Sequence, residues 1–322
     1  MQSPVGNRPI LLAGSGRSGT TFAAKLIDSH PDILLRYEPD KALRTDAIPY
    51  LPPDHPDPEM IRNAAEYLDK LLRSGNATAS GSRPFFRKSY RGRLAELVHR
   101  GWSTTARALD RVAGLPVPDL ARGTTPRYLM KTVSSLWRTR LLKLARPDLV
   151  VVHLVRHPCA VVASRLRGIS LGRMPGDVFL DAIFSAGRGG NFGFDKQTLE
   201  GKTIEEQMAF AWMAINQQVY DDMHQHDDYR LVIYEDLCSD LPAQMHSLFE
   251  FLDLEENAQT ASFVNELQGL GDTSRYFSVR RSPTSALTKW QQELDAEQIA
   301  AVREIVSASE LGRRFTSNPT SG

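Results

Sequence analysis

A glycine-dense segment near the start of the chain constrains the fold more than any other feature. Residues 14–19 read G-S-G-R-S-G, which excludes a regular helix or strand. The apolar run Pro9–Ala13 before it predicts a short buried strand, and the residues from Thr20 predict a helix that ends before Pro31. Another apolar run, Ile33–Tyr37, predicts a second strand. The order strand, glycine loop, helix, strand is typical of parallel α/β folds.

A loop between a strand and a helix can bind an anion, because backbone N–H groups and the helix N-terminus point at the ligand. The spacing G-x-x-x-x-G occurs in nucleotide triphosphatases, but Thr20 stands where those proteins have a lysine. Here Arg17 supplies the cation, and a guanidinium binds two phosphate oxygens at once. The alternative is a plain glycine-rich turn. We predict a phosphorylated ligand, held by these residues: Gly16, Arg17, Ser18, Gly19, Thr20 and Thr21.

A second cationic position follows a central strand. Leu149–Val155 is apolar on both faces, as expected of a parallel strand covered on both sides. It delivers Arg156 to its carboxyl end, where open α/β sheets bind ligands, and Ser164 lies two turns into the next predicted helix. A triphosphatase has a magnesium-binding Asp after this strand, so Arg156 predicts a second phosphate and no metal. The alternative is an arginine paired with a surface carboxylate.

The remaining chain continues the alternation of strands and helices. We predict further strands over 128–133 and 230–234, and helices over 58–73, 158–166, 203–225, 241–252, 258–268 and from Asp295, which with Gln298 resembles a capping pair. Residues 168–201 are rich in glycine and predict a long mobile loop. The pattern predicts an α/β fold: a P-loop-like, doubly wound parallel sheet flanked by helices.

One domain is expected over residues 1–322, because no linker or repeat divides the chain. Helical and loop insertions at 40–125 and 168–228 are expected to form an acceptor site, and 316–322 a flexible tail. Residues 83–111 contain eight Lys or Arg residues and only two acidic residues. Two interpretations stay open for this stretch: a solvated helix face, or a surface for an anionic acceptor or for peripheral contact with membrane lipid.

Composition excludes several classes of protein. Lys+Arg is 39 and Asp+Glu is 38, so the net charge of +1 predicts no nucleic-acid partner. The two cysteines, Cys159 and Cys238, are too few for a disulfide framework, and neither they nor the eight histidines have metal-ligand spacing. No apolar run is long enough for a membrane span or a signal peptide. We therefore expect a cytoplasmic protein without a metal; the oligomeric state is not readable.

Together the two cationic motifs resemble those of the sulfotransferases that use 3′-phosphoadenosine 5′-phosphosulfate (PAPS). Arg17–Thr21 (R-S-G-T-T) is similar to that family's 5′-phosphosulfate loop, and Arg156 with Ser164 is similar to its 3′-phosphate motif. Residues 234–237 read Y-E-D-L, which is found across sulfotransferases. The family usually has Asp where His157 stands. The matching segments are 9–39, 127–167, 229–254 and 282–306.

The Golgi carbohydrate sulfotransferases show the closest resemblance. Their stretch R-S-G-S-S-F, H-P-D-V and E-P is similar to residues 17–22, 30–33 and 38–39, and their S-x-x-W-R-x-x-L segment is similar to residues beginning at Ser285. Those enzymes carry a membrane anchor and lumenal disulfides, and we expect neither here. The resemblance therefore implies a soluble, bacterial-type relative that transfers a sulfuryl group from PAPS, leaving the bisphosphate PAP, to a hydroxyl of a sugar or glycolipid.

The resemblance also implies roles for individual residues. Glu38 is the candidate general base for the acceptor hydroxyl; alternatively it pairs with Arg17 or Arg36, and His30, His153 and His157 are rival bases. Arg17, which would neutralise the phosphosulfate, is a second candidate catalytic residue. Lys131 is a third because of its position at the end of a predicted buried strand: it either reaches the transferred group or carries a surface charge. Further cofactor-binding candidates are Arg156, Ser164, Tyr234, Arg281 and Ser285. The resemblance implies that Tyr234 contacts adenine; the alternative is a tyrosine of the core. Two other functions stay open: a small-molecule kinase with a degenerate phosphate loop, and a non-catalytic nucleotide-binding protein.

Overall fold

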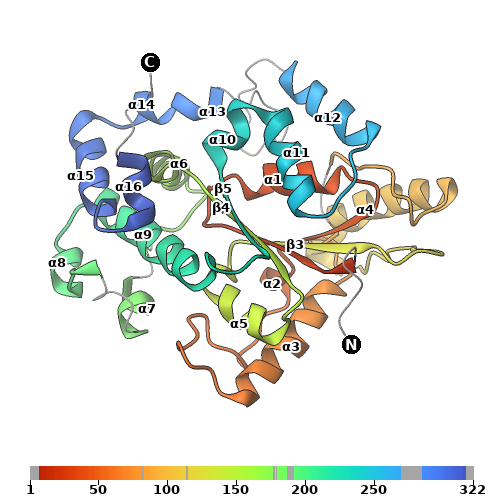
Figure 1. The fold of residues 1–322 in the computed structure, drawn as a ribbon, viewed down its shortest axis with the longest axis horizontal. Helices are drawn as coiled ribbons and strands as arrows, with labels where there is room; N and C mark the ends of the chain where they lie inside the picture. The colour runs from red at the N-terminus through yellow and green to blue at the C-terminus, as the bar shows by residue number, and fades with distance from the viewer. Residues whose placement is uncertain are drawn as a thin grey trace.

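The structure is a computed structural model. It describes residues 7–80, 83–113, 115–176, 178, 180–186, 192–269 and 285–316. A twisted sheet runs through the middle of the molecule, with helices on both sides (Figure 1). No helix among these residues is long and apolar enough to cross a membrane.

The sheet has five parallel strands in the order β2-β3-β1-β4-β5. The strands are β1 (Ile10–Ala13), β2 (Ile33–Tyr37), β3 (Arg127–Thr132), β4 (Val150–Val155) and β5 (Tyr229–Ile233). β1 lies at the centre, paired with β3 on one side and β4 on the other. The predicted doubly wound parallel sheet is confirmed, and its carboxyl edge carries the loops that follow β1, β2, β3 and β4.

Helices cover both faces of this sheet (Figure 1). They are α1 (Thr20–Asp28), α2 (Pro39–Ala42), α3 (Pro58–Leu72), α4 (Arg93–Ala113), α5 (Thr139–Ala145), α6 (Pro158–Ser170), α7 (Leu180–Ser185), α8 (Lys196–Glu200), α9 (Ile204–Met223), α10 (Tyr234–Ser239), α11 (Leu241–Phe251), α12 (Ala258–Gln268), α13 (Ser285–Thr288), α14 (Trp290–Glu293), α15 (Ala296–Val306) and α16 (Glu310–Thr316), with a short 3₁₀ helix at Leu136–Arg138. The expected capping pair of Asp295 and Gln298 starts α15.

The alternation of side chains along each strand builds two hydrophobic layers. In β1, Ile10 and Leu12 pack with α1, α10, α11 and α12 on one face. Leu11 and Ala13 pack with α3, α5 and α9 on the other. A third cluster joins α6, α9, α15 and α16 beyond the end of β4. Apolar cover on both faces explains why the central strands read as continuous apolar runs.

The structure differs from the sequence-based expectation between residues 168 and 228. The stretch 168–201 was expected to be one long loop, but α6 extends to Ser170, and α7 and α8 form further along. Val219 and Met223 of α9 are buried against the sheet, so this helix belongs to the central fold. Short helices such as α7 and α8 escape periodicity analysis because one or two turns contain too few apolar positions. That 40–125 and 168–228 form an acceptor site stays a prediction.

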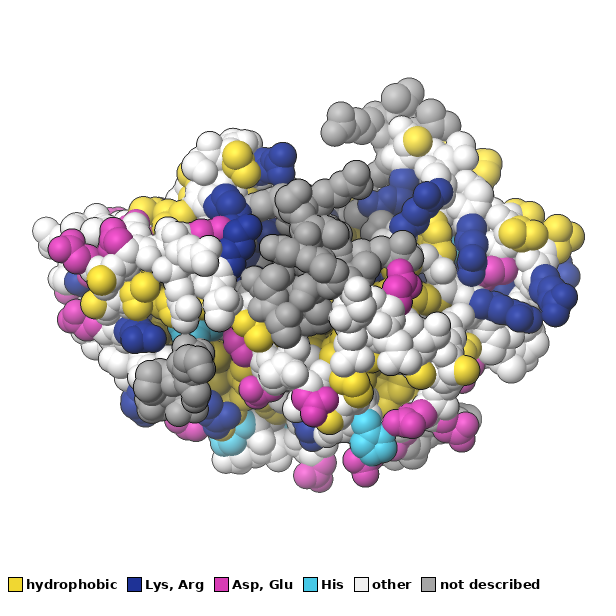
Figure 2. Space-filling view, turned by 90° about the horizontal axis from the view of Figure 1, so that it is seen from above, with side chains coloured by type: hydrophobic (Ala, Val, Ile, Leu, Met, Phe, Trp, Pro, Cys, Tyr) yellow, Lys and Arg dark blue, Asp and Glu magenta, His cyan; other side chains and the backbone are white. Residues whose placement is uncertain are grey.

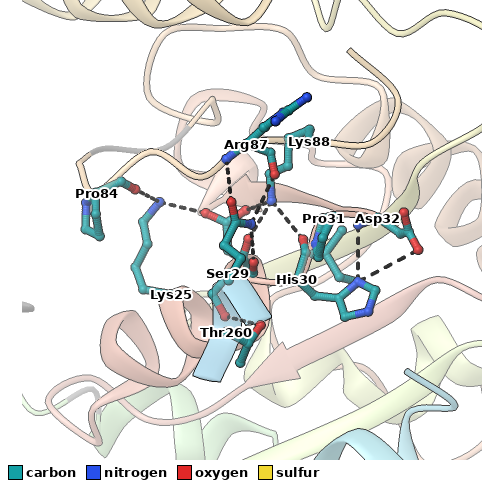
Figure 3. Close-up of polar contacts among 12 residues, drawn as sticks. Lys25, Ser29, His30, Pro31, Asp32, Pro84, Arg87, Lys88 and Thr260 are labelled. Carbon is teal, nitrogen blue, oxygen red and sulfur yellow. Dashed lines mark hydrogen bonds and ion pairs between the residues drawn. The ribbon is translucent and has the colours of Figure 1, made fainter. Parts of the chain in front are cut away.

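The basic stretch 83–111 is less uniform than its charge count indicates, because two of its cations are buried. Lys88 and Lys25 both form ion pairs with the buried Asp28, at 3.0 and 2.8 Å. Figure 3 shows the two lysines converging from α1 and from the 83–92 segment. Arg91 pairs with Glu96 at 3.5 Å. The Lys88–Asp28 pair fastens the segment before α4 to the end of α1, and the Arg91–Glu96 pair fastens the same segment to α4.

Candidate functional site

The glycine loop is packed so closely at both ends that side chains are excluded there. A Cβ atom at Gly14 would lie 2.6 Å from the carbonyl oxygen of Leu154. Gly19 has a φ of +93°, and a Cβ atom there would lie 2.4 Å from the ring of Tyr234. At Gly16, by contrast, a Cβ atom would meet nothing within 4 Å. The loop is therefore held tightly at its ends and is open at its middle, as an anion cradle requires.

The two cationic motifs meet at this loop. Arg17 Nε donates a hydrogen bond to Ser164 Oγ at 2.9 Å, across 147 residues of sequence. Arg156 Nη1 donates to the carbonyl oxygen of Arg17 at 3.3 Å. Arg17 also has a φ of +73°, a backbone conformation that costs a non-glycine residue about 1 kcal/mol or more. The sequence placed Arg17, Arg156 and Ser164 in two separate motifs, and the structure brings them together.

Two hydroxyl groups of the loop are buried without a hydrogen-bond partner among the described residues: Ser15 Oγ and Ser18 Oγ. Buried polar groups are normally satisfied, so each such group calls for an explanation. Ser18 is fully buried next to Arg17, at the N-terminal end of α1. Two donors, a helix N-terminus and two guanidinium groups fit an anionic ligand such as a phosphate or phosphosulfate group.

Tyr234 packs beneath the loop. Its side chain is 1% exposed, its ring lies edge-on to Phe22 at 6.2 Å, and the guanidinium carbon of Arg156 lies 4.7 Å from the ring centre. The same ring blocks any side chain at Gly19. Tyr234 thus holds both the loop and Arg156 in place, while a contact with adenine stays a prediction. Ser285 begins α13, its side chain is not described, and Arg281 lies outside the described residues.

Glu38 lies directly after β2, in a left-handed conformation with a φ of +46°. Its partners are lysines: Lys131 donates to Oε1 and Lys41 pairs with Oε2. Burial raises the pKa of Glu38, but the two lysines outweigh burial, so the net pKa lies below its usual value. Arg36, one of the alternative partners, instead binds Asp119 with both nitrogens of its fork, at 2.9 and 2.6 Å.

A short path of contacts connects Glu38 to the loop. The hydroxyl groups of Thr21 and Tyr37 share a hydrogen bond of 3.0 Å. Lys131 Nζ lies 4.6 Å from the centre of the Tyr37 ring, and the Glu38 amide donates to the Lys131 carbonyl at 2.8 Å. The carboxyl ends of β1, β2 and β3 therefore deliver the phosphate loop, a carboxylate and a lysine to one region of the sheet edge.

Asp40 forms a second connection between the same two strand ends. Its Oδ2 accepts hydrogen bonds from Thr132 Oγ1 and from Ser135 Oγ, the latter at 2.7 Å. Its Oδ1 is buried and has no hydrogen-bond partner among the described residues. Since Asp40 follows Glu38 by two residues and Thr132 follows Lys131, these bonds run beside the Glu38–Lys131 pair. Sequence analysis missed Asp40; the acidic residue in E-P-D, directly after a strand end, was the available signal.

Glu235 is a further residue that the sequence reading passed over, although it is the acidic residue of Y-E-D-L. It lies 3.9 Å from Arg156 Nε and accepts from the backbone amide of His157 at 3.2 Å. Burial raises the pKa of Glu235 above its usual value, although Arg156 opposes that shift. Glu235 therefore orients the arginine that follows β4.

The three histidines considered as bases all make structural contacts. His153 is fully buried, bonded to Tyr229 and Asn216 at 3.0 and 3.1 Å, and burial lowers its pKa to about 4. His157 accepts from the Cys159 amide at the start of α6 and stacks on Trp290 with ring centres 4.6 Å apart. His30 bonds the Glu255 carbonyl at 3.1 Å and accepts from the Asp32 amide at 3.1 Å, the latter drawn in Figure 3. Glu38 is the candidate that lies beside Lys131 at the strand ends.

No group of three or more His, Cys, Asp or Glu side chains that could hold a metal ion occurs in the part of the chain that the structure describes. Cys159 and Cys238 are buried and are not joined in a disulfide.

Comparison with known proteins assigns this arrangement to a family. A family model described as the sulfotransferase family matches residues 9–258. Carbohydrate sulfotransferase 2 of Mus musculus is 28% identical over 185 residues, which cover 51% of this chain and 34% of the relative. Carbohydrate sulfotransferase 2 of Homo sapiens is 24% identical over an alignment of 338 residues, covering 89% and 61%. The chain thus spans between about a third and three-fifths of the length of these relatives.

Solved structures with related titles align over most of the chain at low identity. The sulfotransferase domain of the Synechococcus PCC 7002 olefin synthase has a TM-score of 0.45 and 15% identity, covering 94% of this chain and 97% of that one. Mouse sulfotransferase SULT7A1, solved with PAP, has a TM-score of 0.44 and 11% identity, covering 97% and 89%.

Proposed function

Because the chain belongs to the sulfotransferase family, we propose that it moves a sulfuryl group from PAPS to a hydroxyl group of an acceptor. The observation that carries this proposal is the meeting of Arg17, Arg156 and Ser164 at one glycine loop. A donor with a phosphosulfate at one end and a 3′-phosphate at the other needs two anion sites, and the loop and Arg156 offer one cation each.

The residues of the loop fit the anionic end of the donor. Arg17 and the unpartnered hydroxyls of Ser15 and Ser18 would hold the phosphosulfate, together with the amides at the start of α1. Arg156 and Ser164 would hold the 3′-phosphate. PAPS supplies an activated sulfuryl group, whose S–O bond to the 5′-phosphate breaks as the acceptor oxygen forms a new S–O bond.

Glu38 is the proposed general base. Lys131 and Lys41 lower its pKa, so the carboxylate is ionised at neutral pH and can accept the proton of the acceptor hydroxyl. The two lysines favour the ionised form of the Glu38 carboxylate, and the lower pKa also makes that carboxylate a weaker base. Lys131 stands beside it, where its positive charge would also stabilise negative charge on the transferred group.

The acceptor is proposed to be a sugar or a glycolipid. This rests on the similarity to carbohydrate sulfotransferase 2 in two mammals. Parts of the stretches 40–125 and 168–228 are proposed to shape its site. The two cysteines, Cys159 and Cys238, are buried and not joined in a disulfide, which fits a reducing compartment such as the cytoplasm, where we propose the reaction takes place.

A calorimetric titration with adenosine 3′,5′-bisphosphate tests the donor site without an acceptor. We expect metal-free binding to the wild type and a loss of at least tenfold (about 1.4 kcal/mol) in Arg156→Ala. Arg62→Ala, which removes an exposed arginine of α3, is the matched control and should bind as the wild type does. Absence of metal-free binding to the wild type, with binding of ATP–Mg²⁺ instead, would overturn the proposal.

Turnover is tested separately with sulfur-35-labelled PAPS and a panel of sugars and glycolipids. Glu38→Gln should keep the affinity for the bisphosphate and lose transfer by about 10²–10⁴-fold, the usual contribution of a general base. Transfer by Glu38→Gln at the wild-type rate would exclude Glu38 as the base.

A further inference from the structure

Helix α4 buries a mainly polar face and exposes its large apolar side chains. Glu96, His99, Ser103 and Ala106, which are three or four residues apart, are at most 6% exposed. The large apolar side chains lie on the other side, with these exposed fractions: Leu94 75%, Leu97 67%, Val98 53% and Trp102 41%. A helix on a globular protein normally buries its apolar stripe, so this orientation is reversed.

Specific contacts hold the polar face of α4 against the protein. Glu96 accepts from Arg100 at 2.9 Å and pairs with Arg91 at 3.5 Å. The ring of His99 bonds the Pro118 carbonyl at 3.1 Å, and Trp102 Nε1 donates to the Pro116 carbonyl at 2.7 Å. Turning the helix to bury its leucines would break the bonds to Pro116 and Pro118 and separate the buried Glu96 from Arg91. The apolar stripe is therefore fixed toward the outside.

A row of arginines flanks the stripe. Arg93, Arg100 and Arg107 are seven residues apart, so they lie almost on one line along the helix, beside the line of Leu97. Arg93 and Arg107 are exposed, and the Arg100 side chain is 38% exposed. Figure 2 shows Lys/Arg and hydrophobic side chains gathered together at the end of the molecule where α4 projects in Figure 1.

We propose that α4 docks the protein on an anionic lipid bilayer, lying flat among the headgroups. An amphipathic helix with leucine and tryptophan on one face and arginine beside them binds such an interface through apolar burial and charge attraction. Charge complementarity selects the bilayer over a second copy of this chain. Two copies joined antiparallel through this stripe would bring their arginine rows close together, and a parallel pair would leave each row without an anionic partner, whereas anionic headgroups neutralise the row.

The docking surface, defined as Leu94, Leu97, Val98 and Trp102 with the flanking arginine row, is distinct from the sheet edge that holds the proposed reaction site. The docking proposal rests on the exposed residues of α4 and does not depend on which chemical group the protein transfers. A membrane-docked chain would, however, act on acceptors held at the same surface, such as glycolipids.

Vesicle sedimentation of the full chain tests the proposal. We expect binding to phosphatidylcholine vesicles that contain phosphatidylserine, weaker binding to pure phosphatidylcholine, and weakening with added salt. Leu94→Asn/Leu97→Asn should lower partitioning at least about tenfold. Leu144→Asn/Leu171→Asn removes two leucines that are exposed elsewhere, at 43% and 52%, and should bind as the wild type does.

A charge variant gives an independent measurement. Arg93→Gln/Arg107→Gln should lower binding to the anionic vesicles by roughly thirtyfold, since each basic residue near such a surface contributes a factor of about five. It should leave binding to pure phosphatidylcholine unchanged. Thermal melting checks that all variants fold.

Three results would overturn the proposal: no binding of the wild type to either vesicle, equal binding by the leucine variant and the wild type, or dimerisation without lipid that Leu94→Asn/Leu97→Asn abolishes. The last result would show that a second copy covers the docking surface.

Discussion

Replacing Gly19 with alanine tests whether the loop is as tightly packed as the structure indicates. The residue has a φ of +93°, and the new methyl group would lie 2.4 Å from two ring carbons of Tyr234. The side chain of Tyr234 cannot swing away easily, because it is 1% exposed and is held between Phe22 and Arg156. We expect Gly19→Ala to destabilise the fold and to weaken binding of the bisphosphate.

Two costs add up to the expected loss of stability. The left-handed backbone costs a non-glycine residue about 1–2 kcal/mol. Forcing a methyl group into a filled space costs about 1–3 kcal/mol. The free energy of unfolding should therefore fall by about 2–5 kcal/mol. At about 2 °C per kcal/mol, the lower end of the range for large domains, Tm should fall by roughly 4–10 °C.

Calorimetry or circular dichroism measures this shift, with Gly16→Ala as the matched control. A Cβ atom at Gly16 meets nothing within 4 Å, so that variant should change stability by less than about 1 kcal/mol. Combining Gly19→Ala with Tyr234→Ala should cost less than the sum of the single changes, because the second substitution removes the clash. A Gly19→Ala protein as stable as the wild type, or additive costs in the double variant, would refute the reasoning.

Three further predictions concern buried charges. Lys131→Met leaves Glu38 buried beside one fewer cation, so the pKa of Glu38 should rise and the acid limb of the activity–pH profile should move to higher pH; an unmoved limb would argue against Glu38 as the titrating base. Asp40→Asn should lower kcat more than it raises KM, and Asp40→Glu, which keeps the carboxylate, should restore part of kcat. If both variants lose the same activity and their Tm falls in parallel, Asp40 has a structural role only. Asp28→Asn should cost about 3–5 kcal/mol because it leaves two buried lysines unpaired. The pKa of Asp28 is below its ordinary value of 3.8, because the lysines outweigh burial. Its contribution to the free energy of unfolding is therefore full above pH 3.8 and is lost as the pH falls. Chemical denaturation at a series of pH values should show this loss in the wild type and not in the variant.

Strong local signals allow the secondary structure of the first forty residues to be predicted from the sequence. The apolar runs and glycines define both strands and the start of α1 so sharply that these predicted and observed limits differ by one residue at most. The order of the strands in the sheet cannot be predicted in the same way, because β1 pairs with β3 and β4, which lie more than a hundred residues away in the sequence. The sequence pattern predicts which residues form strands, whereas tertiary packing determines which strands pair with one another.

The charged residues show the same limit. Nothing local indicates that Lys88 is buried, because its partner Asp28 lies 60 residues earlier. Periodicity likewise shows that α4 is amphipathic but not which side faces the core, and here long-range partners reverse the usual side. At the site, the sequence nominated Glu38 and Lys131 separately, and their pairing appears only when β2 and β3 lie side by side.

The left-handed backbone at Arg17 and Glu38 has a consequence for protein engineering. Both residues hold a conformation that glycine or asparagine would adopt with less strain, and both are proposed to act in the reaction. A screen that selects only for heat resistance should therefore recover replacements at these two positions and produce robust but inactive chains. Stabilising this scaffold without losing turnover means leaving those two strained positions untouched and seeking gains elsewhere.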